Sequence, residues 1–399
     1  MKHHSRRSVL YDAVGLGMLA FSRARFDVRV LGFDDFEVEP GTLFVSTHRS
    51  DYDVPLICGV IYPRGHMWRR RQTRPWFAVR DDLFLPGFFA GHPPGVSPNL
   101  RRVLHPIRIG PALDLVQCLP IRSPHRMRLV ELLRSALEAE LARVLPPDRL
   151  EALRRRAREL RLAEPRLARD VLRAAYADLL WSVQERRAFD APEFGAAWQQ
   201  RRRAGTRDFR ALAAVLARGD SLLLFPEGRP SPEGEIGPLQ PGVGALVRRG
   251  SPRWLQPFAV AYDPLTRGRP RAYVAAGPPA SPASERIEET VLALLRRTTP
   301  LTPGQLVARS PEASLSRLEH DAAAQVELAL AEGRPFEPGL AETSERRRLL
   351  EEAQAARRRT PLTRLAREYA SAHAREAAQA PTRRRRRVED VRALPARPL

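Results

Sequence analysis

Short apolar segments alternate with helical patterns over the first two thirds of the chain. Residues 26–31 alternate apolar and charged side chains, which is the pattern of a half-buried strand. Residues 42–46 form a mainly apolar, β-branched run, and three later segments also have the character of buried strands: 76–79, 221–225 and 254–262. Helical patterns lie between these segments, beginning with residues 54–60. The alternation predicts an α/β sheet.

Two further regions have helical character of their own. Within residues 126–204 the leucines recur at helical spacing, with arginines and glutamates on the other faces, and prolines interrupt the pattern. From residue 284 to the end the chain is again helical in pattern, and it finishes in a low-complexity Ala/Arg tail that contains residues 383–387, all arginine. We therefore expect one domain over residues 26–283, interrupted by a helical insertion at 126–204 and followed by a helical extension, residues 284–399, with a disordered basic tail.

The N-terminal segment, residues 1–25, contains an apolar run at residues 9–21. A membrane-spanning helix needs ~20 apolar residues, so this run is too short to cross a bilayer. It fits a helix that lies in the membrane interface. An ordinary amphipathic helix packed on the domain fits equally well.

The chain is strongly basic, with a formal net charge of +21 at pH 7. This favours an anionic partner, namely nucleic acid, a lipid surface or a phosphorylated substrate. Lysine occurs only at Lys2, so the arginine excess also fits a compositional bias of the coding sequence. Cys58 and Cys118 have no metal-binding or disulfide-framework spacing, and the histidines share no ligand spacing, so no metal site is predicted.

The first chemical motif is the segment Thr47-His48-Arg49-Ser50-Asp51-Tyr52-Asp53, which follows a predicted strand and opens a predicted helix. A histidine near neutral pH can serve as a general base. Asp53 lies five residues on, so a histidine on the preceding turn can fold back and donate its second ring N–H to that carboxylate. The alternative is a helix cap at Ser50 or Asp51 with His48 on the surface.

The second motif is Phe225-Pro226-Glu227-Gly228-Arg229, directly after an apolar strand. It places a carboxylate and a guanidinium at the carboxyl end of the strand, where α/β sheets bind ligands. Arginine suits a phosphate because its planar fork donates two hydrogen bonds, and a glycine lets backbone approach a ligand closely. The alternative is a tight turn with a surface ion pair.

The two motifs in this order resemble those of the glycerolipid acyltransferase family, of the 1-acylglycerol-3-phosphate type, whose blocks are NH-x4-D and FPEG-[TS]-R. Two lesser blocks are similar as well, namely Pro120-Ile121-Arg122 and the strand 255–260. The chain departs from the family at Thr47, where asparagine is usual, and at Arg229, which stands one position early because Pro230 follows it.

The resemblance implies a central mixed sheet flanked by helices and acyl transfer from acyl-CoA or acyl carrier protein to lysophosphatidate, without any cofactor. It implies His48 as general base, Asp53 as its partner, and Arg122, Glu227, Gly228 and Arg229 as acceptor-binding residues. It also implies peripheral or monotopic attachment to the cytoplasmic face of the cell membrane. The His-Arg-Ser-x-x-Asp spacing is also similar to that of glycerol-3-phosphate acyltransferases, so glycerol 3-phosphate is an alternative acceptor. A non-catalytic module that binds lipid or nucleic acid through its basic helices is the rival from another class, although no base-reading motif is present.

Overall fold

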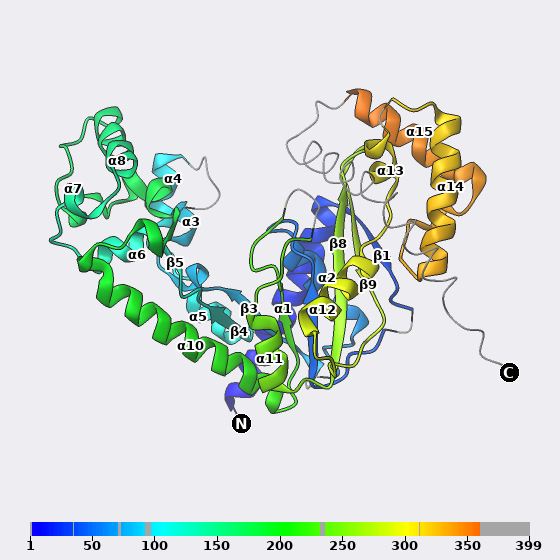
Figure 1. Cartoon of the computed structure of the whole chain (residues 1–399), viewed down its shortest axis with the longest axis horizontal. Coiled ribbons are helices and arrows are strands. Elements are labelled where there is room, and N and C mark those ends of the chain that lie inside the picture. Colours follow the sequence, from blue (N-terminus) through cyan, green and yellow to red (C-terminus); the bar gives the residue numbers. More distant parts are fainter. Residues whose placement is uncertain are drawn as a thin grey trace. The chain divides into compact units, whose positions relative to one another are not determined.

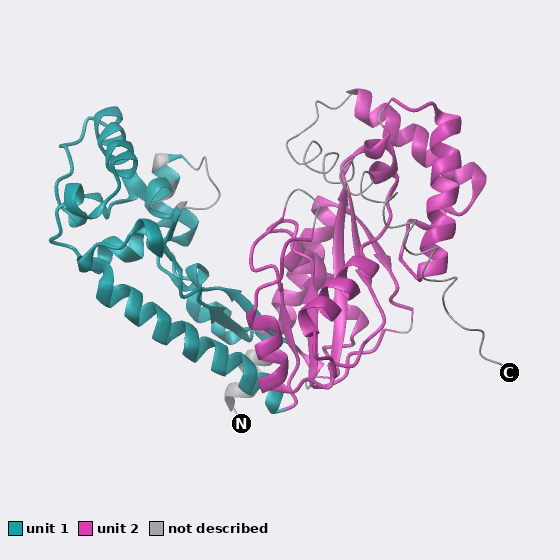
Figure 2. Cartoon of the chain, in the orientation of Figure 1, with its two compact units in different colours: residues 1–10, 75–218 teal, residues 11–74, 219–399 magenta. Residues whose placement is uncertain are grey.

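The computed structural model describes residues 2–34, 36–70, 73–91, 97–231, 236–310 and 312–359. The chain divides into two compact units (Figure 2): unit 1 comprises residues 1–10 and 75–218, and unit 2 comprises residues 11–74 and 219–399. The predicted insertion, residues 126–204, lies inside unit 1. The basic run at residues 383–387 lies outside the described residues.

Seven strands form one mixed sheet in the order β1-β9-β8-β2-β7-β3-β4 (Figure 1). The strands are β1 (Asp27–Leu31), β2 (Thr42–Ser46), β3 (Trp76–Arg80), β4 (Cys118–Ile121), β7 (Leu222–Leu224), β8 (Trp254–Asp263) and β9 (Arg271–Ala276). The pairs β1/β9, β2/β8, β2/β7 and β3/β4 are parallel, whereas β8 and β9 are antiparallel. The predicted α/β class with a mixed central sheet is therefore confirmed.

The five strands that the apolar runs predicted are all present, but β4 and β9 were not predicted. All six residues of β9 are buried, because the strand pairs with β1 on one side and β8 on the other. Its sequence RAYVAA is rich in alanine and has a single β-branched residue, so the local signal for a strand is weak.

Helices of unit 2 cover the sheet and build the C-terminal extension. The helices outside unit 1 are α1 (Lys2–Arg25, which begins in unit 1), α2 (Asp53–Arg64), α11 (Gly242–Gly250), α12 (Ile287–Thr298), α13 (Pro303–Arg309), α14 (Leu315–Glu332), the 3-10 turn η7 (Pro338–Leu340) and α15 (Thr343–Arg359). Helices α2 and α12 contact β8. Helices α13, α14 and α15 enclose an apolar cluster of their own, which confirms a helical C-terminal region.

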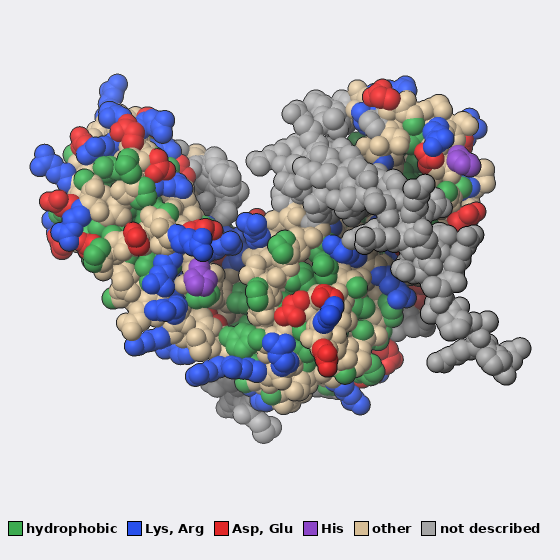
Figure 3. Space-filling model, viewed as in Figure 1, with side chains coloured by type: hydrophobic (Ala, Val, Ile, Leu, Met, Phe, Trp, Pro, Cys, Tyr) green, Lys and Arg blue, Asp and Glu red, His purple; other side chains and the backbone are tan. Residues whose placement is uncertain are grey.

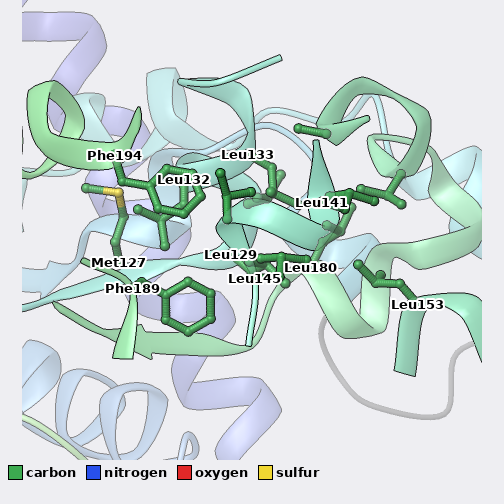
Figure 4. Close-up of a cluster of buried hydrophobic side chains, with 14 of the residues drawn as sticks. Met127, Leu129, Leu132, Leu133, Leu141, Leu145, Leu153, Leu180, Phe189 and Phe194 are labelled. Carbon is green, nitrogen blue, oxygen red and sulfur yellow. The ribbon is translucent and has the colours of Figure 1, made fainter. Parts of the chain in front are cut away.

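Unit 1 holds β3, β4 and a mostly helical region with its own core. Its other elements are η2 (Asp81–Phe84), α3 (Phe88–Gly91), α4 (Pro98–Leu104), α5 (Gly110–Leu115), β5 (Arg126–Arg128), α6 (Leu129–Arg134), α7 (Leu141–Val144), α8 (Pro147–Glu159), η3 (Ala168–Val171), η4 (Ala174–Tyr176), α9 (Ala177–Leu180), β6 (Val183–Glu185), η5 (Arg186–Ala188), η6 (Pro192–Phe194) and α10 (Gly195–Ala217). Leu129, Leu132, Leu133 and Leu141, which recur at helical spacing, are buried in this core together with Phe194 (Figure 4). The insertion thus has a hydrophobic core of its own, and it includes one short antiparallel strand pair, β5/β6.

Candidate active site

The first motif sits on a turn between the carboxyl end of β2 and the start of α2. Thr47 anchors this turn to β8: its backbone N–H donates to the carbonyl of Phe258 at 3.3 Å, and its hydroxyl accepts from the N–H of Val260 at 3.0 Å. A threonine hydroxyl therefore holds the position at which the resembling family usually has asparagine. The turn lies where parallel strands end, the usual ligand-binding edge of an α/β sheet.

His48 and Asp53 form a buried hydrogen-bonded pair. The distance from His48 Nδ1 to Asp53 Oδ2 is 2.9 Å, and the Asp53 side chain is completely buried. Asp53 Oδ2 also accepts from the backbone N–H groups of Arg49, at 2.5 Å, and Ser50, at 2.9 Å. An ionised carboxylate only accepts hydrogen bonds, so Nδ1 carries the proton and Nε2 keeps its lone pair. This is the arrangement required of a general base with an orienting partner.

The other contacts of His48 fix its ring and its backbone. The imidazole stacks on the ring of Phe225, with centroids 4.4 Å apart, and the His48 carbonyl accepts from the N–H of Ser231 at 2.7 Å. Nε2 has no hydrogen-bond partner within the described part of the chain, and His48 is 8% exposed. A small acceptor oxygen can therefore approach Nε2 while the rest of the histidine stays fixed.

Sequence reasoning missed Tyr262, which contacts the same carboxylate. Its hydroxyl donates to Asp53 Oδ1 at 2.6 Å, and it accepts from the Ser50 hydroxyl at 2.9 Å. Burial raises the pKa of Tyr262 well above its ordinary value, and the Asp53 charge adds to the effect. The one signal in the sequence is a tyrosine on a mainly apolar strand, because a buried tyrosine hydroxyl needs a partner.

Glu227 joins the second motif to the first. Its Oε1 accepts from the backbone N–H of His48 at 2.8 Å, and its Oε2 accepts from the N–H of Gly237 at 3.0 Å. The residue is 3% exposed, and burial raises the pKa of its carboxyl, an effect that these two N–H groups and the Arg49 charge partly offset. Glu227 was predicted to bind the acceptor, but here both of its oxygens have partners within the protein.

Gly228 and Arg229 continue this turn towards solvent. Gly228 has a φ of +70° and donates its N–H to the carbonyl of Phe225 at 3.0 Å, so the turn needs a residue that tolerates left-handed backbone. Arg229 is exposed, and its side chain has no ion pair or hydrogen bond among the described residues.

Arg122 belongs to unit 1, whereas the other predicted site residues belong to unit 2. It pairs with Asp208 of α10: one terminal nitrogen, Nη1, lies 2.7 Å from Oδ1 and 2.9 Å from Oδ2, and its backbone N–H also donates to this carboxylate at 3.2 Å. The Arg122 side chain is 30% exposed. The remaining guanidinium nitrogens can still donate to a phosphate.

The described residues contain no group of three or more His, Cys, Asp and Glu that could hold a metal ion.

Neither a protein-family model nor a curated protein matches the chain. Among solved structures, it is similar to the 1-acyl-sn-glycerophosphate (LPA) acyltransferase PlsC from Thermotoga maritima, with 14% sequence identity over 74% of this chain and 81% of that chain and a TM-score of 0.37. A likeness this distant carries no weight for function.

Proposed function

We propose that this protein is an acyltransferase that moves a fatty acyl group from acyl-CoA or acyl carrier protein to the free hydroxyl of lysophosphatidate. The observation that carries the proposal is the His48/Asp53 pair, in which a fully buried carboxylate holds Nδ1 at 2.9 Å and leaves Nε2 unoccupied. A pair of this kind activates a hydroxyl and needs no serine or cysteine nucleophile.

The proposed reaction is a direct transfer. His48 Nε2 takes the proton of the acceptor hydroxyl while that oxygen attacks the carbonyl carbon of the thioester. The new C–O bond forms, the C–S bond breaks, and the departing thiolate takes the proton back from the imidazolium. Asp53 holds the ring in the productive tautomer and stabilises the imidazolium that forms between these events.

The acceptor phosphate needs a cation, and Arg229 and Arg122 are the two candidates from the sequence motifs. Arg229 is exposed on the turn that contains Gly228 and Glu227. Its guanidinium can donate two hydrogen bonds to one phosphate. Glycerol 3-phosphate presents the same phosphate as lysophosphatidate and is the alternative acceptor. We propose lysophosphatidate as the preferred acceptor, because the Phe-Pro-Glu-Gly block is similar to that of the 1-acylglycerol-3-phosphate type.

A lipid acceptor requires access to a membrane, and we propose that the protein attaches peripherally to the cytoplasmic face of the cell membrane. No helix within the described ranges is long and apolar enough to span a bilayer. The exposed side of α1 supports attachment: between Ala13 and Ala24 it consists of Ala13, Leu16, Gly17, Ala20, Phe21 and Ala24 together with one charged residue, the basic Arg23. Leu16 is 56% exposed and Phe21 is 48% exposed. Asp12, the acidic residue within this stretch, points inward and accepts from the hydroxyl of Tyr62 at 2.7 Å.

The test is release of free thiol from long-chain acyl-CoA and from acyl carrier protein, with lysophosphatidate and glycerol 3-phosphate offered separately. Wild-type protein should release thiol only when an acceptor is present. His48→Ala should lose this activity, whereas His125→Ala, which changes an exposed histidine, should keep it. Acceptor-independent release, or equal rates for His48→Ala and wild type, would refute the proposal. Binding to heparin or DNA without any turnover would favour the non-catalytic alternative.

A further inference from the structure

The carboxylate of Asp53 is held on both sides, and the residue on the second side comes from a distant strand. Oδ2 faces His48 and two backbone N–H groups, while Oδ1 accepts from the Tyr262 hydroxyl at 2.6 Å. Tyr262 lies on β8, 209 positions along the chain from Asp53, and is buried. The aspartate thus has no oxygen left without a donor.

The hydrogen bonds that lead to Asp53 Oδ1 form a chain in which each group donates to the next. The backbone N–H of Tyr52 donates to Ser50 Oγ at 3.1 Å, and Ser50 Oγ donates in turn to the Tyr262 hydroxyl oxygen at 2.9 Å. The hydrogen of the Tyr262 hydroxyl is then left for Asp53, because a carboxylate can only accept. Burial, which raises the pKa of Tyr262 well above its ordinary value, keeps this hydroxyl protonated and therefore a donor.

We infer that Tyr262 is a positioning residue for the proposed acyl transfer, and that it acts through Asp53 without touching the substrate. This inference rests on the function proposed above. A carboxylate held on one oxygen only can turn about its Cβ–Cγ bond, which would move Oδ2 away from His48 Nδ1. The Tyr262 hydroxyl holds the opposite oxygen, Oδ1, and so fixes the position of Oδ2 beside His48. It also draws part of the negative charge towards Oδ1, which reduces the charge on Oδ2.

The other charged and titratable groups around His48 and Asp53 belong to three segments of the chain. Arg49 and Tyr52 belong to the same turn, Glu227 comes from the turn after β7, and Tyr262 comes from β8. The Tyr262 hydroxyl donates directly to Asp53 Oδ1, so a change at Tyr262 acts on this oxygen.

The test compares Tyr262→Phe with Tyr62→Phe in the full-length protein. Tyr62 is the matched control, because it too is buried and donates its hydroxyl to an aspartate, Asp12, at 2.7 Å. Tyr262→Phe should lower kcat about tenfold, the order expected for losing a hydrogen bond to a charged group, with little change in the acceptor KM. The acid limb of its kcat profile should move to higher pH by roughly half a unit. Without the Tyr262 donor, the Asp53 carboxylate interacts more strongly with the imidazolium form of His48. Tyr62→Phe should show neither change.

A second readout does not need turnover. In protein labelled with ¹⁵N-histidine, the Nδ1–H proton of His48, assigned by its loss in His48→Gln, should move in Tyr262→Phe and stay in place in Tyr62→Phe. An unchanged resonance and an unchanged pH profile would overturn the role of Tyr262. If wild type shows no thiol release, the proposed function fails, yet the resonance still decides whether Tyr262 controls the pair. Should Tyr262→Phe not fold, Ser50→Ala removes the hydroxyl that orients Tyr262, and a smaller shift in the same direction is expected.

Discussion

The backbone N–H of His48 donates to Glu227 Oε1 at 2.8 Å, which joins two residues 179 positions apart in the chain. Glu227 also accepts from Gly237, so it ties the turn after β2 to the loop after β7. The second motif therefore supports the general base directly. A carboxylate that is buried beside backbone N–H groups is best suited to fixing geometry.

We expect Glu227→Gln to lower kcat modestly and Glu227→Ala to lower it strongly. A glutamine can accept from only one of the two N–H groups, since its NH₂ must face the other, whereas alanine leaves both N–H groups without an acceptor. The expected losses are about tenfold for glutamine and about 100-fold for alanine, as each lost hydrogen bond to a charged group corresponds to about 1.5 kcal/mol or more. Separate measurement of kcat and acceptor KM decides the role: a fall confined to kcat indicates support of His48, while a rise in KM with constant kcat would indicate acceptor binding.

His48→Ala should reduce acceptor-dependent thiol release by about 10²- to 10⁴-fold, the usual contribution of a general base. Asp53→Asn should also be severe. Its amide oxygen can still accept from the three donors on the Oδ2 side, so the turn keeps its shape while the negative charge is lost.

The double variant His48→Ala/Asp53→Asn tests whether the pair acts as a unit. It should be little slower than either single variant, because effects within one catalytic unit are not additive. Additive losses in folded proteins would mean that the two residues act independently, contrary to the proposed mechanism.

Local patterns in the sequence predicted the parts of the site that are close together in the chain. Residues 42–46 were predicted to be a strand and residues 54–60 a helix, which placed His48 and Asp53 on the turn between them, and that turn is present. Their pairing depends on only five residues of chain.

The partners that complete the site come from far away in the chain, and no local pattern specifies them. Tyr262 reaches Asp53 only because β8 lies beside β2, and Arg122 meets Asp208 only through the packing of α10 on β4. Packing between elements that are distant in the chain decides both contacts. Periodicity can predict that a strand exists, but it carries no information on which strand becomes its neighbour.

Replacing a phosphate-binding arginine by lysine should raise the acceptor KM while the donor KM changes little, because lysine keeps the charge but loses the two-pronged geometry. Arg229→Lys is the cleaner test, since the Arg229 side chain forms no ion pair or hydrogen bond with any described residue. Arg122→Lys also disturbs the pair with Asp208, so its melting temperature must be measured alongside. Equal loss towards donor and acceptor would assign either arginine a structural role instead.

Asp82 offers a test of stability against pH in unit 1. Burial alone would raise the pKa of Asp82, but ion pairs with Arg80, at 2.7 Å, and with Arg128 outweigh it and hold the pKa below its ordinary value. Because the folded pKa is the lower one, this stabilisation is present above the unfolded pKa of about 3.9 and is lost as pH falls through the folded pKa. Asp82→Asn should therefore cost about 3 kcal/mol at pH 7. The gap to wild type should shrink as pH falls below about 4.

Urea unfolding followed by tryptophan fluorescence at pH 7 and at pH 3.5 measures this difference. Asp190→Asn is the control, because Asp190 is exposed in the same unit. A constant gap between Asp82→Asn and wild type at both pH values would show that the ion pairs do not contribute in the way described.

The exposed face of α10 is strongly basic. Arg202, Arg203, Arg207 and Arg210 are exposed, and their side chains form no ion pair with any described residue. The acidic residue of this helix, Asp208, is buried and engaged with Arg122. Figure 3 shows the resulting row of basic side chains along this helix. Some exposed arginines elsewhere in unit 1 pair with acidic neighbours, as in Arg143 with Glu193, Arg158 with Glu151 and Arg169 with Glu138.

We expect this face to bind anionic lipid, with about 1 kcal/mol from each arginine near the surface. Changing the four α10 arginines to glutamine should weaken cosedimentation with phosphatidylglycerol vesicles by about tenfold or more at low salt, and added salt should erase the difference because it screens charges beyond ~10 Å. The control changes four paired arginines of unit 1, Arg126, Arg143, Arg158 and Arg169, and so removes the same charge. This control should bind vesicles nearly as wild type does, since its arginines are already neutralised by carboxylates. Equal weakening in both variants would mean that net charge alone drives binding, and loss of binding to acyl carrier protein with unchanged vesicle binding would assign α10 to the acyl donor instead.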